Sequence, residues 1–332
     1  MIGYGPWTKI VSAHSYHTGR RHLWICLALS LLASGAPAQV SDSHPGATRF
    51  SVRDEPITPI PAPPDADPLK LALGERLFED ERLSRNNARA CSSCHDTRTN
   101  GAGGNLHDMA LDGQELSSNT NTVFNAALSF RLNWEGTFRT FETQAEALLD
   151  NPKIMGTSVD EVVQKLSADP KMVQQFRESY GHGPDRASLL DAIATYERSL
   201  LTPGSRFDRW LEGDAAVLSA EEQNGYQLFK SFGCISCHQG VNVGGNLFER
   251  HGVFPARASP KSRSLRVASL RNVAATPPYF HYGRVSTLEG AVSDMGRTQL
   301  DRTLSAPEIK AIVAFLRTLT GTYRGHPVEA PR

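Results

Sequence analysis

Two short motifs in the sequence combine side chains that can bind an iron cofactor. Residues 91–95 and 234–238 both have the form Cys-x-x-Cys-His. The two thiols of such a motif can add to the vinyl groups of haem, and the adjacent histidine then reaches the iron from the proximal side. The sequence therefore predicts two covalently attached haem c groups. The residues that would hold them are Cys91, Cys94 and His95 in the first motif and Cys234, Cys237 and His238 in the second.

Other interpretations of the paired cysteines fit less well. A zinc ribbon places its two pairs roughly 15–20 residues apart, whereas Cys94 and Cys234 are 140 residues apart. A thioredoxin-like redox pair requires a strand-helix-strand context, which the surrounding sequence does not have. Two local disulfides would not explain why a histidine follows each pair. The fifth cysteine, Cys26, lies in the N-terminal leader described next.

The N-terminus has the pattern of a secretory leader. Arg20 and Arg21 precede an apolar run, residues 23–32, and the small-residue site Ala36-Pro-Ala follows. This order is typical of a signal peptide, and the run is too short for a stable membrane anchor. We expect residues 1–38 to be removed and the protein to be periplasmic. Residues 39–67 are rich in proline and predict an extended segment.

Composition limits the classes of function. The chain has 332 residues, which is enough for about two domains. It carries 35 basic and 35 acidic residues, and removal of the leader would take away bases but no acids. Without a basic excess there is no electrostatic case for nucleic-acid binding. Hydrophobic residues make up 39% of the chain, as in soluble globular proteins.

The periodicity after residue 67 predicts an all-α fold with long loops. Residues 186–201 show the spacing of an amphipathic helix, and another helix is expected from Ser305 to Gly321 with Pro307 in its first turn. Serine followed three residues later by glutamate predicts helix starts. These pairs are Ser158 with Glu161, Ser219 with Glu222, Ser286 with Glu289, and Ser305 with Glu308.

The sequence contains an internal repeat. A Gly-x-x-Leu-Phe pattern precedes each Cys-x-x-Cys-His motif, at Gly74 and at Gly225. Beyond the motifs, matched positions continue without gaps: Asn125 with Asn272, Trp134 with His281, Gly136 with Gly283, Thr140 with Thr287, and Glu142 with Glu289. Self-similarity of this kind predicts two related units. We expect two cytochrome c-like haem domains in tandem, at residues 68–204 and 205–325.

The repeat also predicts that the two irons differ. In its register Met295 matches Leu148. A thioether is a common sixth ligand in c-type haems and raises the reduction potential, whereas leucine cannot bind iron. This favours a His238/Met295 haem that carries electrons and a His95 haem whose distal face is open or differently filled. The alternative is that Met295 only packs in the core.

The sequence resembles the bacterial dihaem cytochrome c peroxidase and MauG-like family. The resemblance rests on Cys91-Ser-Ser-Cys-His-Asp, Asn121-Thr-Val-Phe-Asn-Ala, Thr276-Pro-Pro-Tyr-Phe-His-Tyr-Gly and Met295-Gly-Arg-Thr-Gln. It implies that electrons enter at the C-terminal haem and pass to the N-terminal haem, where H₂O₂ is reduced. It also implies a small electron-donor protein (a c-type cytochrome or a cupredoxin), one Ca²⁺ between the domains, and commonly a homodimer.

The resemblance assigns roles to particular positions. Trp134 corresponds to a tryptophan between the haems, Gln144 to a distal-pocket glutamine, and His281 to a histidine near the inter-haem region. Asn119, Thr276 and Pro278 correspond to calcium ligands, and side-chain and backbone oxygens suit this hard cation.

Three positions depart from the family pattern. Leu111 stands where a loop histidine gates the N-terminal haem, Ile154 where a distal glutamate moves peroxide protons, and Leu148 where a distal proline lies. None of these side chains can transfer a proton. His107 either substitutes as a distal residue or is simply exposed to solvent. The sequence thus leaves open a peroxidase, a MauG-like oxidase of another substrate, and a dihaem electron carrier without peroxidase activity.

Overall fold

The computed structural model describes residues 55–253 and 263–331. These residues are mainly helical, with two small two-stranded sheets, as the sequence predicts. The expected signal peptide (1–38) and the first part of the proline-rich segment lie outside the described residues. Residues 55–67 have no regular secondary structure, in agreement with an extended segment. None of the helices in the described ranges is both long and apolar enough to span a membrane.

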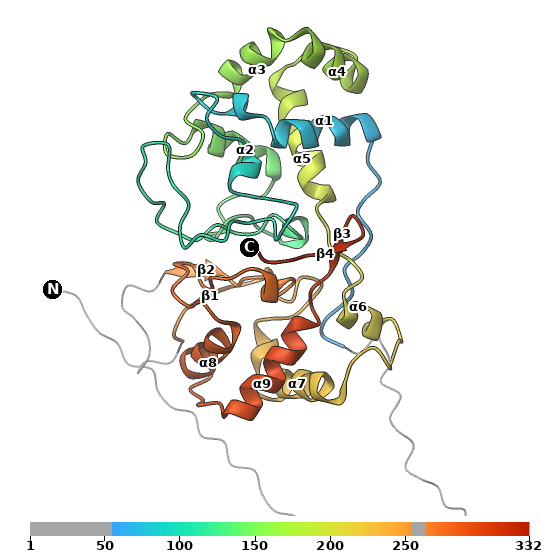
Figure 1. Ribbon diagram of the computed structural model, residues 1–332, viewed down its shortest axis with the longest axis vertical. Helices are drawn as coiled ribbons and strands as arrows, with labels where there is room; N and C mark the ends of the chain where they lie inside the picture. Colours follow the sequence, from blue (N-terminus) through green and yellow to red (C-terminus); the bar gives the residue numbers. More distant parts are fainter. Residues whose placement is uncertain (1–54, 254–262, 332) are drawn as a thin grey trace, which may run out of the picture. The chain divides into compact units, whose positions relative to one another are not determined.

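The helices and strands are labelled in Figure 1. The helices are α1 (Pro68–Phe78), α2 (Phe141–Asp150), α3 (Val159–Ser167), α4 (Pro170–Tyr180), α5 (Arg186–Ser199), α6 (Arg206–Leu211), α7 (Ala220–Ser231), α8 (Leu288–Gln299) and α9 (Ala306–Arg317). Strand β1 (Phe248–Arg250) pairs antiparallel with β2 (Ser264–Arg266), and β3 (Thr322–Tyr323) pairs with β4 (His326–Pro327). Short 3₁₀ turns cover Glu81–Leu83, Cys91–Ser93, Ala126–Leu128, Cys234–Ser236 and Val273–Ala275.

Most of the predicted helix starts are confirmed. Ser158, Ser219 and Ser305 cap α3, α7 and α9, each in a capping box with the glutamate three residues later. The prediction of Ser286 as a cap is wrong by one residue, because the hydroxyl of Thr287 accepts the capping bond from Gly290 N and α8 begins at Leu288. The predicted end of α9 at Gly321 is also wrong, since the helix stops at Arg317.

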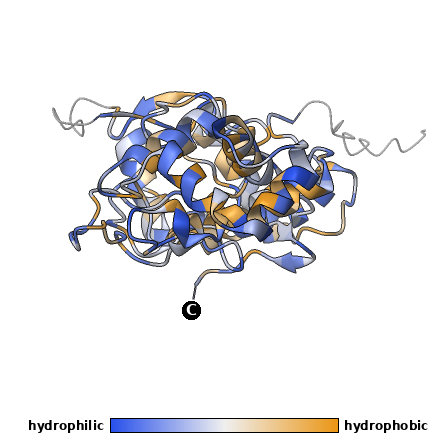
Figure 2. Ribbon diagram, turned by 90° about the horizontal axis from the view of Figure 1, so that it is seen from above, coloured by the Kyte–Doolittle hydropathy of each residue, from blue (hydrophilic) through white to orange (hydrophobic). Residues whose placement is uncertain are grey.

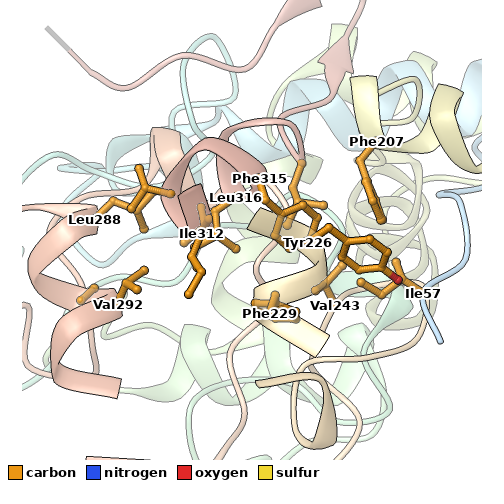
Figure 3. Packing of buried hydrophobic residues seen from close by; sticks show 14 of the residues in the cluster. Ile57, Phe207, Tyr226, Phe229, Val243, Leu288, Val292, Ile312, Phe315 and Leu316 are labelled. Carbon is orange, nitrogen blue, oxygen red and sulfur yellow. The ribbon is translucent and has the colours of Figure 1, made fainter. Parts of the chain in front are cut away.

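The helices form two groups, each with its own hydrophobic core. In the first group α1 packs on α4 and α5, and α2 packs on α5; in the second, α7 and α8 pack on α9 (Figure 1). We call α1 to α5 with their loops the N-terminal half, and α6 to α9 with their loops the C-terminal half. Most helices carry both hydrophobic and hydrophilic residues (Figure 2), as expected for helices that bury one face. Figure 3 shows the core of the C-terminal half around Tyr226 and Phe315.

The backbone reproduces the sequence repeat. Asn125 and Asn272 both have a φ of 59°, and each is followed by a 3₁₀ turn. An isolated bridge then joins residues 132 and 138 in one half and residues 279 and 285 in the other. The helices α2 and α8 begin at corresponding positions after Thr140 and Thr287. The two halves therefore share one local architecture from this asparagine to the following helix.

A glycine permits the main helix crossing in each half. A Cβ on Gly74 would lie 2.1 Å from Ala192 O, and a Cβ on Gly225 would lie 1.9 Å from Ala311 O. Both distances are far inside van der Waals contact, and the obstructing atoms belong to backbone. The matched Gly-x-x-Leu-Phe patterns thus mark the closest approach of α1 to α5 and of α7 to α9.

The ends of the described chain cross between the halves. Ile57, which precedes α1, is buried in the core of the C-terminal half. At the other end, Val328 packs with Phe78 and Phe124 of the N-terminal half, and Arg324 forms a bidentate ion pair with Glu75 at 2.6 and 2.7 Å. Each half is therefore completed by a segment from the opposite end of the chain.

A buried ion pair anchors the segment before α1. Arg271 and Asp208 are 0% and 1% exposed, and their N–O distance is 2.7 Å. The Arg271 guanidinium also donates to Thr58 O and Val241 O, while Ile60 N donates to Asp208. The pair thus connects α6, the loop after His238 and the extended segment.

Removal of the Asp208 charge should strongly destabilise the fold. The variant Asp208→Asn leaves the Arg271 charge buried without compensation, so we expect a loss of about 3–5 kcal/mol in the free energy of unfolding. Asp214→Asn is the matched control, because its pair with Arg209 is exposed and should contribute less than about 1 kcal/mol. Denaturant unfolding followed by circular dichroism measures both. Equal small losses would contradict the anchoring role.

Candidate functional site

The two Cys-x-x-Cys-His motifs have the same local geometry. In each, the first cysteine begins a 3₁₀ turn, and the backbone N–H of the histidine donates to the carbonyl of that cysteine at 3.0 Å, from His95 to Cys91 and from His238 to Cys234. The turn brings the histidine back beside its two thiols. All four cysteines in the described residues are free thiols, so no disulfide competes for them.

Both motif histidines are oriented by a backbone carbonyl. His95 Nδ1 lies 3.2 Å from Gly101 O, and His238 Nδ1 lies 3.3 Å from Val243 O. A carbonyl can only accept, so Nδ1 carries the proton and Nε2 keeps its lone pair. Burial lowers the pKa of both rings, to about 4 for His238. Neutral imidazoles fixed in this tautomer are the form that binds a metal.

The acceptor carbonyls are themselves held in matching ways. Gly101 O also accepts from Val123 N at 3.0 Å, and Val243 O accepts from Leu270 N at 3.2 Å. Gly101 has a φ of 70° and Val243 a φ of 46°, so both loops turn sharply after the histidine. The repeat therefore extends to the backbone that positions each ring.

The thiols are not activated as nucleophiles. Burial is the main cause that raises the pKa of Cys91 to about 12 and the pKa values of Cys94 and Cys234 to about 11, and it also raises that of Cys237. Redox-active pairs have lowered thiol pKa values because the thiolate is the reactive form. The surroundings therefore do not favour a thioredoxin-like pair and fit haem attachment, in which the sulfurs become thioethers.

Helix α2 and two loops bring together the positions expected on the distal side of the first motif. Gln144 and Leu148 are half-buried and one turn apart on α2. Leu111 N donates to Lys153 O at 2.8 Å, so the loop that carries Leu111 is bonded to the loop that carries Ile154. Ile154 packs partly against the core of the N-terminal half. Leu111 and Ile154, two of the positions that depart from the family pattern, thus lie on adjacent loops and are apolar.

The loop that carries Leu111 is a small hairpin with several fixed points. Ala110 N donates to Gln114 O at 2.7 Å, and Leu116 N donates to Asp108 O at 2.8 Å. The buried Asp108 carboxylate accepts from Thr120 and Asn105, at 2.5 and 3.1 Å. These bonds close residues 108–116 into one unit.

Met295 lies in the third turn of α8 and is half-buried. Its neighbour Asp294 accepts from Arg284 at 2.8 Å and pairs with His251 at 3.3 Å. On the other side, Gly296 leaves room for Leu304, whose side chain would lie 2.9 Å from an added Cβ. The helix around Met295 is therefore held on both flanks.

Trp134 and His281 meet, although they occupy corresponding positions in the two halves. Their rings contact edge to face at 5.3 Å. Trp134 Nε1 donates to Asn119 O at 2.8 Å, and Asn119 N donates to His281 O at 2.9 Å. The structure thus brings together three of the residues that sequence comparison marked as inter-haem or calcium positions. Thr276 and Pro278 lie in the segment just before His281, and the Thr276 hydroxyl donates to Val273 O.

Two histidines, His281 and His107, have buried ring nitrogens that form no hydrogen bond within the described part of the protein. Both ring nitrogens of His281, and Nε2 of His107, are buried without a hydrogen bond. His107 Nδ1 pairs with Glu115 at 3.5 Å, and His281 Nε2 lies 3.7 Å from Glu135. Buried nitrogens without a hydrogen bond are unfavourable, and the propionate carboxylates of haem are acceptors of the kind they lack. Together with the two oriented proximal histidines, this donor set fits haem.

The structure also identifies polar residues that the sequence analysis missed. Asn100 and Asn242 are buried next to the carbonyls that orient the proximal histidines. Glu197 on α5 lies near Cys91, and burial raises the pKa of its carboxyl to about 8. The spacing of Asn100 and Asn242 after their motifs, five and four residues beyond the histidine, was the only available signal. Local sequence gives no indication that Glu197 is buried.

Comparisons with known proteins agree with this geometry. The sequence profile of the di-haem cytochrome c peroxidase family matches residues 68–216. The chain is 38% identical over 290 residues to cytochrome c peroxidase Ccp of Escherichia coli, with 82% of this chain covered and 62% of that protein's length. It is 39% identical over 315 residues to cytochrome c551 peroxidase of Nitrosomonas europaea, which covers 89% of this chain and 90% of that protein.

A solved structure supports the same fold. A MauG-like protein associated with microbial copper homeostasis superposes with a TM-score of 0.68 at 26% identity, over 79% of this chain and 93% of that one. Membership of a di-haem family implies two haem c groups, which the paired motifs and their oriented histidines can hold. From its sequence relatives and its fold, the chain belongs to the di-haem cytochrome c peroxidase family of oxidoreductases.

Proposed function

We propose that the protein is a periplasmic dihaem peroxidase in which electrons enter at a C-terminal His238/Met295 haem and pass to an N-terminal His95 haem to reduce H₂O₂. The observation that carries this proposal is the pairing of matched proximal sites with unequal distal residues. Both histidines are oriented by a backbone carbonyl. The positions expected to provide a sixth ligand differ, because Met295 in one half corresponds to Leu148 in the other. Haem supplies iron that cycles between oxidation states. The side chains at these two positions would determine which iron can bind peroxide.

The proposed C-terminal site would hold its iron between two protein ligands. His238 Nε2 is left free by the bond from Nδ1 to Val243 O. Met295 is presented by a helix that is fixed on both flanks by Asp294 and Gly296. A thioether ligand raises the reduction potential, so this haem would accept electrons from a small donor protein, a c-type cytochrome or a cupredoxin.

The proposed route between the haems passes through the contact of Trp134 and His281. Their edge-to-face packing joins the two halves, and the indole is fixed by its bond to Asn119 O. Asn119 donates its side-chain amide to Asn105 O and Leu106 O, which leaves its Oδ1 free. That oxygen, with Thr276 and Pro278, would supply ligands for one Ca²⁺, a cation that takes side-chain amide and backbone oxygens.

At the proposed N-terminal site, the chain offers little to move protons. Gln144 can donate and accept hydrogen bonds to orient a small ligand, but an amide is a poor acid or base. Leu111 and Ile154 lie on bonded loops and would exclude water without transferring protons. His107 precedes the hairpin and pairs with Glu115. Burial is the main cause that lowers the pKa of His281, and His107 lies close enough to contribute. These contacts favour a place for His107 beside His281.

This apolar distal side gives specific support to a second candidate function. A dihaem electron carrier would not need proton transfer to peroxide. The other candidate is a MauG-like oxidase of another substrate. The similarity to the MauG-like structure is in keeping with that alternative. All of these functions are compatible with two haem domains, residues 68–204 and 205–325. They are also compatible with a homodimer.

Met295 should control the C-terminal haem. In Met295→Ala the thioether ligand is lost, so the weak red-edge charge-transfer band of a His/Met ferric haem should disappear and the potential of that haem should fall. Met172→Ala provides a matched control, because Met172 is a fully buried core methionine and its loss should change stability only. An unchanged band and potential in Met295→Ala would show that another residue binds the iron.

Peroxide reduction should be limited by proton transfer. We expect the wild type to turn over slowly with a reduced c-type cytochrome as donor, and Ile154→Glu to increase kcat by about tenfold or more, because a carboxylate there can accept and return a proton. Ile154→Gln has a similar volume without an acidic group and should give no increase. Fast turnover by the wild type, or equal rates in both variants, would contradict the role assigned to Ile154.

A further inference from the structure

Each proximal loop contains one buried asparagine that reaches the opposite half of the chain. Asn100 is 0% exposed and Asn242 is 2% exposed. Asn100 immediately precedes Gly101, whose carbonyl orients His95, and Asn242 immediately precedes Val243, whose carbonyl orients His238. The two asparagines therefore occupy corresponding positions, one residue away from the hydrogen bond that fixes each ring.

In the first loop, the side chain of Asn100 bonds on both sides. Its Nδ2 donates to Ala275 O at 2.9 Å, in the 3₁₀ turn of the C-terminal half. Its Oδ1 accepts from Ala102 N at 2.9 Å, so the same side chain closes the backbone around Gly101. A displacement of Ala275 O would therefore be transmitted to the carbonyl that holds His95.

In the second loop, Asn242 reaches in the opposite direction. Its Nδ2 donates to Asn125 O at 3.2 Å and to Ser129 Oγ at 3.0 Å, around the 3₁₀ turn of the N-terminal half. Its Oδ1 accepts from the hydroxyl of Ser269 at 2.7 Å. The turns that the two asparagines contact are themselves corresponding elements of the repeat, residues 126–128 and 273–275.

The carbonyl beside each asparagine has a direct influence on a metal bound by the ring. A hydrogen bond from Nδ1–H raises the basicity of the histidine ligand, and a more basic ligand favours the ferric state. If the carbonyl moves away, the ligand becomes less basic and the reduction potential rises. The position of each carbonyl is therefore a control on the potential of its own haem.

We propose that Asn100 and Asn242 are positioning residues through which each half of the chain sets the reduction potential of the haem in the other half. The inference rests on the proposed function, in that His95 and His238 bind the two irons. Beyond that function, Asn100 connects the N-terminal site to the C-terminal half, and Asn242 connects the C-terminal site to the N-terminal half.

The experiment is a spectroelectrochemical titration of the holoprotein, with each haem followed by its own absorption and electron paramagnetic resonance signals. Asn100→Ala should raise the potential of the N-terminal haem and Asn242→Ala that of the C-terminal haem. We expect a change of about tenfold in the reduction equilibrium of the affected haem, which corresponds to about 59 mV for one electron. The other haem should shift less in each variant.

The control loosens a contact between the halves that lies away from the proximal loops. Arg324 pairs with Glu75 at 2.6 and 2.7 Å, and within the described residues no hydrogen bond joins either residue to a proximal loop. Arg324→Gln should therefore reduce stability without moving either potential. If the potentials of Asn100→Ala and Asn242→Ala differ from the wild type by no more than that of Arg324→Gln, the inference is overturned.

Ser129→Ala is the decisive variant, because it removes only one hydroxyl and lies in the N-terminal half. It should raise the potential of the C-terminal haem in the same direction as Asn242→Ala, through the lost bond to Asn242. A shift confined to the N-terminal haem would overturn the inference. Fewer than two haems in the wild type would overturn the proposed function as well, whereas two haems with unchanged potentials would overturn only the inference.

Discussion

The hydroxyl of Thr202 links matched asparagines in the two halves of the molecule. It accepts hydrogen bonds from the amides of Asn125 and Asn272, which occupy corresponding positions in the repeat. All three residues are fully buried, so these bonds are protected from water and costly to break. Because each asparagine also begins the 3₁₀ turn of its half, the junction fixes the two matched backbones against one another.

On either side of this junction lie two motif sites with the same backbone geometry and different surrounding side chains. The proximal side is the same in both halves: a turn after the cysteines, a carbonyl on Nδ1, and a buried asparagine beside it. The differences lie in side chains carried by equivalent backbone. Met295 replaces Leu148, and His281 replaces Trp134. The repeat thus preserves the backbone around each motif, while the proposed differences in ligand and access rest on single side chains.

Interlocking of the halves gives the two sites a fixed relation. Ile57 fills the core of the C-terminal half, and Val328 packs on the N-terminal half. The bonds of Asn100 and Asn242 cross the same boundary in opposite directions. These bonds are the physical basis of the coupling proposed above between each proximal loop and the opposite half.

Local sequence patterns predicted the parts of the structure that depend on near neighbours. The capping boxes at Ser158, Ser219 and Ser305 follow from spacing of a few residues. The repeat marked Gly74 and Gly225 as equivalent positions, and the structure shows that both lie at helix crossings. Helix ends such as that of α9 were less accurate, because Gly321 is explained by its contact with Thr202 O rather than by a helix cap.

Long-range contacts could not be predicted in this way. Nothing in the spacing around Asn100 or Asn242 indicates a partner in the other half, since those partners are 175 and 117 residues away. The same holds for the crossing of Ile57 and Val328. The distal positions Leu111 and Ile154 were recognised only through family resemblance, and the structure adds that their loops are bonded to each other.

The central claim is that the N-terminal iron has His95 as its only strong protein ligand. An electron paramagnetic resonance spectrum of the fully oxidised holoprotein tests it directly. We expect one low-spin signal from the His238/Met295 haem and one high-spin signal from the N-terminal haem, because Leu111 and Leu148 cannot bind iron. Two low-spin signals with no high-spin iron would contradict it, and conversion of one of them to high spin in His107→Ala would identify His107 as the ligand.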